Sequence, residues 1–355
     1  MLRCGSQGRR PSRARRPGPT GPGTSSAHRG SPRHDEFVGR RLVAAGNGRW
    51  AGVLVERYRA ETGCAASADR RGDSLVATAP PAERWLLIES RTPWPRNALS
   101  SLRRTAGGSA DELGPDVARR CMQLGYRPVL IRRFGRIDRA VPRRWALVDS
   151  RPGRESVRWG ELPSDEHLLE VLGEADPGAT SHEPIYLVCT HGRHDACCAV
   201  RGRPVAAALA AAYPERTWEC SHIGGDRFAA NVVVLPHSLF YGHVTAPRAV
   251  ELAKHYDEGL VVPDLLRGSG AFTPPVQAAQ HYARAAGHSL ALDTLLPTAT
   301  RQLPNKHWHI ELATETARVT VELSVHLDSM DVRLTCASTP PAQVRRFQLR
   351  NLTTH

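Results

Sequence analysis

The sequence predicts an α/β protein with a β-rich C-terminal part. Apolar strand patterns alternate with amphipathic helix patterns between residues 84 and 285. Strand patterns alone follow between residues 307 and 336. The chain has 355 residues, of which 41% are hydrophobic, so it is long enough to form two domains that each have a core.

Residues 1–36 form a basic segment rich in Gly, Pro and Ser. The segment has too little apolar surface to build a core, so we expect it to be disordered. Up to residue 34 it holds eight arginines and no acid, which leaves about +5 of the net charge of +13 for the rest of the chain. The other arginines are scattered and form no basic stripe interleaved with aromatic residues, so we expect no nucleic-acid partner.

The composition also bears on the expected location of the protein. No apolar run approaches the ~20 residues that span a bilayer, so we expect no membrane partner. The basic N-terminus is not followed by the apolar core of a secretory signal. Eight unevenly spaced cysteines in a chain of this size are typical of a reducing compartment. We therefore expect a cytoplasmic protein whose thiols are free or bind metal.

The first expected domain covers residues 37–175. Gly63 and Cys64 open its folded part, and Gly125 ends a helix because glycine readily adopts the left-handed conformation of a C-cap. Residues 173–182 are rich in Gly and Ala and form the expected linker. The strand patterns are 84–89, 128–131, 145–149 and 156–159, and the helix patterns are 115–124 and 163–172.

The second expected domain covers residues 182–285, and a β-rich extension covers 286–355. Thr273 is expected to cap a helix whose first turn holds Pro274 and Pro275. The strand patterns of this domain are 185–188, 217–220, 229–235 and 239–244, and its other helix patterns are 204–213 and 246–256. The extension has strand patterns at 309–312, 318–327 and 332–336.

Two loops of the second domain carry side chains that bind metals. Cys189 and Cys198 are separated by eight residues on the first loop, and His222 and Asp226 by three residues on the second. Both loops follow strand ends, where α/β sheets place their ligands. Two loops that each give two ligands can close around a two-iron core, for which thiolates and imidazoles are known ligands.

Neighbouring residues of these loops are candidates for supporting roles. Gly224 and Gly225 would let the backbone pass close to an inorganic core, because they have no Cβ. Arg227 would offset the negative charge of a cluster. Cys197 and Cys220 lie next to the ligand candidates or within a strand, and packing is the simpler interpretation of both.

Other thiols and imidazoles have a structural interpretation. Cys64 and Cys121 are expected to be core thiols, and Cys336 a small core residue on a strand. His191 and His194 are expected to be solvated loop residues or hydrogen-bond donors around the metal ligands. The chain has no C-x-x-C motif, which argues against ordinary dithiol oxidoreductase chemistry.

The loop sequences carry a family resemblance. CTHGRHDACC, AVRGRP and SHIGGDRFAANVVVLP resemble the sucrase/ferredoxin-like family, a branch of the thioredoxin-like [2Fe-2S] ferredoxins, as do RGDSLVATAPPAERWLLIES and GSGAFTPPVQAAQ. The resemblance covers about residues 63–285. It implies two tandem thioredoxin-like domains with the cluster in the second, held by two cysteines spaced C-x8-C and two histidines spaced H-x3-H. Cys189, Cys198 and His222 match this pattern, but Asp226 stands at the position of the second histidine.

The departure at Asp226 leaves the fourth ligand open. Asp226 itself can ligate, since a carboxylate binds ferric iron, although it is a harder ligand. Cys220 or Cys197 can take its place, or the site is incomplete and holds no stable cluster. The spacing favours Asp226.

The expected function is electron transfer by a [2Fe-2S] cluster with mixed Cys/His ligation, in exchange with redox partner proteins rather than as a stand-alone enzyme. One alternative is a thioredoxin-type thiol protein that uses Cys189 or Cys198 as a nucleophile. Another is a structural zinc site formed by the two cysteines, His222 and Asp226. Glycoside hydrolysis has no supporting carboxylate pair in the sequence.

Overall fold

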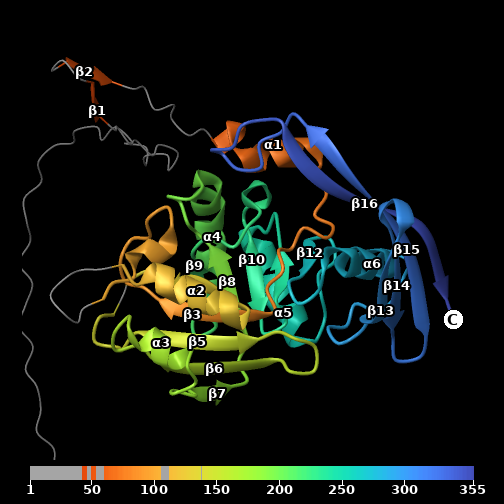
Figure 1. The fold of residues 1–355 in the computed structure, drawn as a ribbon, viewed down its shortest axis with the longest axis horizontal. Coiled ribbons are helices and arrows are strands. Elements are labelled where there is room, and N and C mark those ends of the chain that lie inside the picture. Colours follow the sequence, from red (N-terminus) through yellow and green to blue (C-terminus); the bar gives the residue numbers. More distant parts are fainter. Residues whose placement is uncertain (1–41, 46–48, 53–59, 105–111, 137) are drawn as a thin grey trace, which may run out of the picture. The chain divides into compact units, whose positions relative to one another are not determined.

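The computed structural model describes residues 42–45, 49–52, 60–104, 112–136 and 138–355. All of them belong to one compact unit, residues 37–355. This unit contains a mixed ten-stranded sheet and an antiparallel four-stranded sheet, which confirms the α/β class and the β-rich C-terminal part (Figure 1). The segment 1–36, which we expect to be disordered, lies outside the described residues.

The first half of the large sheet contains β3 to β7. Strand β3 runs parallel to β4 and antiparallel to β5, and β6 pairs with β5, which gives the order β4-β3-β5-β6 with β7 at the edge. Helix α2 ends at Gly125, whose φ of 71° is left-handed, as the sequence predicts. The elements of this half are β3 (Arg84–Glu89), α2 (Gly114–Leu124), β4 (Tyr126–Arg132), β5 (Arg144–Asp149), β6 (Ser156–Glu161), α3 (His167–Val171) and β7 (Ala179–Ser181).

The second half repeats this arrangement. Strand β8 is parallel to β9 and antiparallel to β10, and β11 pairs with β10, so the order is β9-β8-β10-β11 with β12 at the edge. The two halves join where β4 pairs with β9. The elements of this half are β8 (Ile185–Cys189), α4 (Ala196–Ala212), β9 (Thr217–Cys220), β10 (Val232–Leu235), β11 (Leu239–Tyr241), α5 (Ala246–Asp257) and β12 (Leu266–Ser269).

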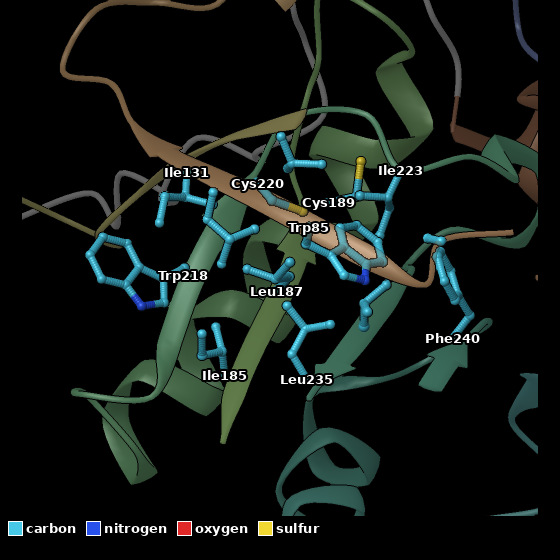
Figure 2. Close-up of a cluster of buried hydrophobic side chains, with 14 of the residues drawn as sticks. Trp85, Ile131, Ile185, Leu187, Cys189, Trp218, Cys220, Ile223, Leu235 and Phe240 are labelled. Atoms are coloured by element: carbon cyan, nitrogen blue, oxygen red, sulfur yellow. The ribbon is translucent and has the colours of Figure 1, made fainter. Parts of the chain in front are cut away.

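The strands alternate their side chains between two faces, and this alternation builds separate clusters. Helices α2 and α3 cover one face of the first half, and α4 and α5 cover one face of the second. The other face forms one cluster shared by both halves, with Trp85 and Ile131 from the first and Leu187 and Trp218 from the second (Figure 2). The shared cluster is the core on which the candidate site rests.

The C-terminal part packs a sheet against a helix. Helix α6 (Pro274–Ala285) buries its apolar face against β14 and β15 of the four-stranded sheet (Figure 1). The strands of this sheet are β13 (Leu296–Leu303), β14 (His307–Ala313), β15 (Arg318–Met330) and β16 (Ala342–Thr354). The elements that precede the large sheet in the sequence are β1 (Leu42–Ala45), β2 (Arg49–Gly52) and α1 (Cys64–Arg71). None of the helices in the described part of the chain is long and apolar enough to cross a membrane.

The structure corrects three details of the sequence prediction. Helix α4 begins at Ala196 instead of residue 204, because Asp195 caps it by accepting a hydrogen bond from the Cys197 backbone N–H. Part of the expected linker 173–182 forms β7. Residues 332–336 are not a strand, so Cys336 lies in the connection between β15 and β16.

Candidate metal centre

The two ligand-bearing loops start side by side. Cys189 and Cys220 are the last residues of the parallel strands β8 and β9, and they are directly paired in register. Both side chains lie at one end of the shared core cluster, beside Ile223 (Figure 2). The parallel pairing therefore brings the loops after Cys189 and Cys220 together, as the sequence predicts.

The start of helix α4 brings Cys198 to the end of β8. Successive helical residues differ by about 100° in direction, so Cys197 and Cys198 cannot face the same group. Cys198 faces Cys189, and α4 approaches closely because Gly202 has no side chain: a Cβ there would lie 2.2 Å from the Cys189 carbonyl oxygen. Cys197 belongs to a different side-chain group, so the structure does not place it at this centre.

The four predicted ligands lie together. The ligand atoms of Cys189, Cys198 and His222 are all within 4.8 Å of one another. The Cys198 thiol donates a hydrogen bond to Asp226 Oδ1 at 3.1 Å, and His222 Nδ1 lies 3.0 Å from the same oxygen. The donor set is two sulfurs, one imidazole and one carboxylate.

His194 is a further member that the sequence analysis left among the supporting residues. Its Nε2 lies 3.6 Å from Asp226 Oδ2, and its ring stacks on that of His222 with centroids 3.6 Å apart and planes 22° apart. The ligand atoms of His194, His222 and Asp226 also lie within 4.8 Å of one another. His194 is therefore a second nitrogen donor beside Asp226.

His191 supports the second loop through hydrogen bonds. It is buried rather than solvated, which leaves the role of a hydrogen-bonding neighbour. Its Nε2 donates to the Pro95 carbonyl oxygen at 2.8 Å, so its Nδ1 accepts the hydrogen bond from the His222 backbone N–H at 3.3 Å. This pair of contacts fixes both the ring orientation and the position of the His222 backbone.

The environment shifts the pKa values of the thiols of the centre in opposite directions. Contacts with the Cys198 and Cys220 thiols lower the pKa of Cys189, which favours its thiolate form. Contact with Cys189, followed by burial, raises the pKa of Cys198. Burial raises the pKa of Cys220, and its contact with Cys189 raises it further. Cys220 contacts Cys189 but belongs to none of the groups of ligand atoms in the described residues.

The Asp226 carboxylate provides the test of whether a cation fits this centre. Asp226 is 1% exposed, yet its Oδ2 has no hydrogen-bond partner, and His222 Nδ1 makes no hydrogen bond of good geometry. A buried polar atom without a partner costs about 1–3 kcal/mol. A cation bound by Asp226, His222 and the two sulfurs would satisfy both atoms, so these residues fit a metal or an iron–sulfur group.

The Asp226 carboxylate shifts the pKa of His222, and this shift can be tested. Burial lowers the pKa of His222, but Asp226 and Cys189 outweigh burial and raise it to about 9. In metal-free protein we expect Asp226→Asn to move this pKa toward 6.5, measured by NMR of the imidazole ring. Asp264→Asn, an exposed acid that pairs with Arg248, is the control and should leave the titration unchanged. An unchanged pKa in Asp226→Asn would contradict the ion pair.

The same ion pair has a defined effect on stability. The pKa of His222 in the folded state lies above its ordinary value of 6.5. The ion pair therefore stabilises the metal-free fold fully below pH 6.5. This stabilisation is lost as the pH rises through about 9.

A buried arginine that the sequence analysis missed holds the second loop. Arg267 on β12 is 1% exposed and donates to the carbonyl oxygen of Gly224 at 2.9 Å. A Cβ on Gly225, whose φ is 85°, would lie 2.4 Å from Arg267 Nη2. The missing side chain of Gly225 therefore makes room for this guanidinium. The neighbouring Arg227 instead pairs with Asp73, with its Nε 3.6 Å from Asp73 Oδ2.

Comparison with known proteins gives one family match, and this match includes both ligand-bearing loops. No curated protein and no solved structure shows a significant match. Residues 75–268, which are 194 of the 355 residues and include both ligand-bearing loops, match the sucrase/ferredoxin-like family. The chain therefore belongs to the sucrase/ferredoxin-like family.

Proposed function

We propose that the chain binds a [2Fe-2S] cluster through Cys189, Cys198, His222 and Asp226 and carries single electrons between redox partner proteins. The observation that carries this proposal is the buried Asp226 oxygen, which lacks a hydrogen-bond partner within a group of two thiols and an imidazole. Thiolates with imidazole replacements are the ligands of such clusters, and the ferredoxin part of the family name agrees.

The repeat supports a finer fold assignment. Each half has a strand, a helix, a parallel strand and then an antiparallel hairpin, with the same strand order. We assign both halves as thioredoxin-like units, with the cluster in the second. The cytoplasmic location and the identity of the redox partners stay predictions.

The chain's own residues prepare the site for an anionic group. When bound, the cluster supplies a one-electron couple. Cys198 lies in the first turn of α4, where the positive end of the helix dipole favours a thiolate. His222 is a neutral ligand, so it raises the reduction potential above that of an all-cysteine set. Its neighbours Asp226 and His191 fix its position.

The exposure of the site favours an electron carrier over a thiol enzyme. Cys189 has the lowered pKa of a nucleophile, but it is 1% exposed and packs in the core, where a substrate cannot reach it. The side chains of His222 and His194 are 28% and 27% exposed. The imidazoles are therefore the part of the site that a partner protein and solvent protons can approach.

The first test is the cofactor content of the full chain purified without oxygen. We expect about two irons and two acid-labile sulfides per chain, absorbance in the visible range and a rhombic EPR signal after reduction. Protein without iron and sulfide would overturn the proposal. Zinc at this site would instead support the structural-metal alternative.

Two variants then identify the fourth ligand. If Asp226 ligates, Asp226→Ala should shift or abolish the EPR signal while His194→Ala preserves it. The reverse result would assign the fourth position to His194. Cys121→Ser, a buried cysteine on α2 that belongs to none of the ligand groups, is the matched control and should keep the wild-type spectrum.

A further inference from the structure

A second group of metal-ligating side chains lies outside the centre described above. Cys64 begins α1, Cys197 lies in the first turn of α4, and Cys336 lies between β15 and β16. The Cys64 sulfur is 3.7 Å from that of Cys197 and 3.6 Å from that of Cys336, and the last two are 3.3 Å apart. Asp195 completes the group, with its Oδ2 3.7 Å from the Cys64 sulfur.

Two of the three sulfur separations match one tetrahedral ion, and the third, 3.3 Å between Cys197 and Cys336, is shorter. With Zn–S bonds of about 2.3 Å, tetrahedral geometry places sulfurs about 3.8 Å apart, and a zinc-bound carboxylate oxygen about 3.5 Å from each sulfur. We propose that Cys64, Cys197, Cys336 and Asp195 bind one structural zinc ion. This site is separate from the proposed iron site and does not depend on it.

The backbone around the group is arranged for negative charge. Cys64 and Cys197 lie in the first turns of two different helices, so the positive ends of both helix dipoles point at their sulfurs. The Cys64 backbone N–H also donates to the Cys336 sulfur at 3.5 Å. Three thiolates and a carboxylate give a zinc site a net charge of −2, and the nearby Arg227 guanidinium offsets part of it.

Asp195 can cap the helix and ligate at once. Its Oδ1 accepts from the Cys197 backbone N–H at 2.8 Å, and its Oδ2 accepts from the Cys336 backbone N–H at 2.6 Å. Each carboxylate oxygen has two acceptor positions, so one lone pair remains for a metal. The two N–H groups hold the carboxylate in the orientation that the ion requires.

Burial and ligand type assign the ion and its role. Cys64, Cys197 and Asp195 are each at most 3% exposed and Cys336 is half-buried, so the four ligands leave little access for a substrate. Four closed ligands with three thiolates are typical of structural zinc. The ion would join three segments that are up to 272 residues apart in the sequence. It would also bind Cys197 in the first turn of α4, next to Cys198 of the proposed iron site.

Metal analysis of the full chain, expressed with zinc in the medium, tests this inference. We expect about one zinc per chain in the wild type and in Cys121→Ser, and less than about a tenth of that in Cys64→Ser and Cys336→Ser. Iron and sulfide content should stay at the wild-type level in all four proteins. Loss of zinc without loss of iron separates this site from the proposed cluster.

Three results would overturn the inference: no zinc in the wild type, zinc retained in both cysteine variants, or a thiol titration that shows two of the three cysteines joined as a disulfide. If the serine variants do not fold, the wild type still gives an answer. Cobalt exchanged into the zinc site should then show a thiolate charge-transfer band, and its absence would count against the site. Zinc without iron would contradict only the proposed [2Fe-2S] function and would leave the zinc site in place.

Discussion

Replacing Cys198 with serine is expected to remove the iron and sulfide from the chain and to leave its zinc in place, whereas Cys197→Ser should do the opposite. Cys198 contacts Cys189 and Asp226, and Cys197 contacts Cys64 and Cys336. Each serine removes one soft ligand from one group only. We expect a drop from about two irons to near zero in the first variant, and from about one zinc to near zero in the second.

The pair is a controlled comparison because the two residues differ in little except direction. They are adjacent in one helical turn, and they are 0% and 1% exposed. A serine at either position therefore disturbs packing to a similar degree. Metal analysis and visible spectra of the two variants measure the result. If both variants lost both metals together, the two groups would have to be a single interdependent site.

The grouping of the candidate ligands could be predicted from the sequence because strand ends fix it locally. Cys189 and Cys220 end two parallel strands, and parallel strands open their loops at the same sheet edge. The resemblance supplied the ligand spacing, and the structure brings all four residues together. The role of His194 was missed, because stacking on His222 depends on the path of the loop and not on a spacing.

The second group could not be predicted from spacing, because its members come from three distant segments. The sequence pattern places Cys336 on a strand, and it predicts that Cys64 is a core thiol, which the structure confirms. One signal was present in the sequence: Asp195 is a good N-cap residue directly before Ala196. A helix that starts there turns Cys197 and Cys198 in different directions, which an extended loop would not fix.

Two strands of the C-terminal sheet were missed for a different reason. Strand β16 is largely exposed and rich in arginine, so it lacks the alternation of apolar residues that marks a half-buried strand. Its pairing with β15 supplies the order that its own sequence does not. The same tertiary context decides the course of β13, whose residues are mostly exposed.

Arg267 connects the fold to the candidate metal centre. Its guanidinium donates to Thr78 O at 2.7 Å, to Gly224 O at 2.9 Å and to Asn231 Oδ1 at 2.8 Å. Burial, followed by the like charges of Arg127 and Arg227, lowers its pKa to about 9, so it stays charged at neutral pH, and the Asp226 carboxylate favours its charge. It therefore occupies the electrostatic position that the sequence analysis gave to Arg227.

We expect Arg267→Met to lower the free energy of unfolding by about 3–5 kcal/mol, because it leaves three buried acceptors without a donor. Arg267→Lys should lose a large part of this stability as well, since an ammonium cannot reproduce the planar fork. Arg203→Met, at an exposed position on α4, is the control and should change stability by less than about 0.5 kcal/mol. Denaturant unfolding of the three variants measures these differences.

The same substitution should affect the cluster. Gly224 lies between His222 and Asp226, so the loss of its hydrogen bond releases the loop that carries both ligands. The loss of a nearby positive charge also favours the oxidised, less negative cluster, which moves the reduction potential to lower values. We therefore expect Arg267→Met to retain less iron and to show a lower reduction potential. The reduction potential of Arg267→Lys should stay close to that of the wild type. A variant with wild-type stability, iron content and potential would show that this guanidinium supports neither the loop nor the cluster.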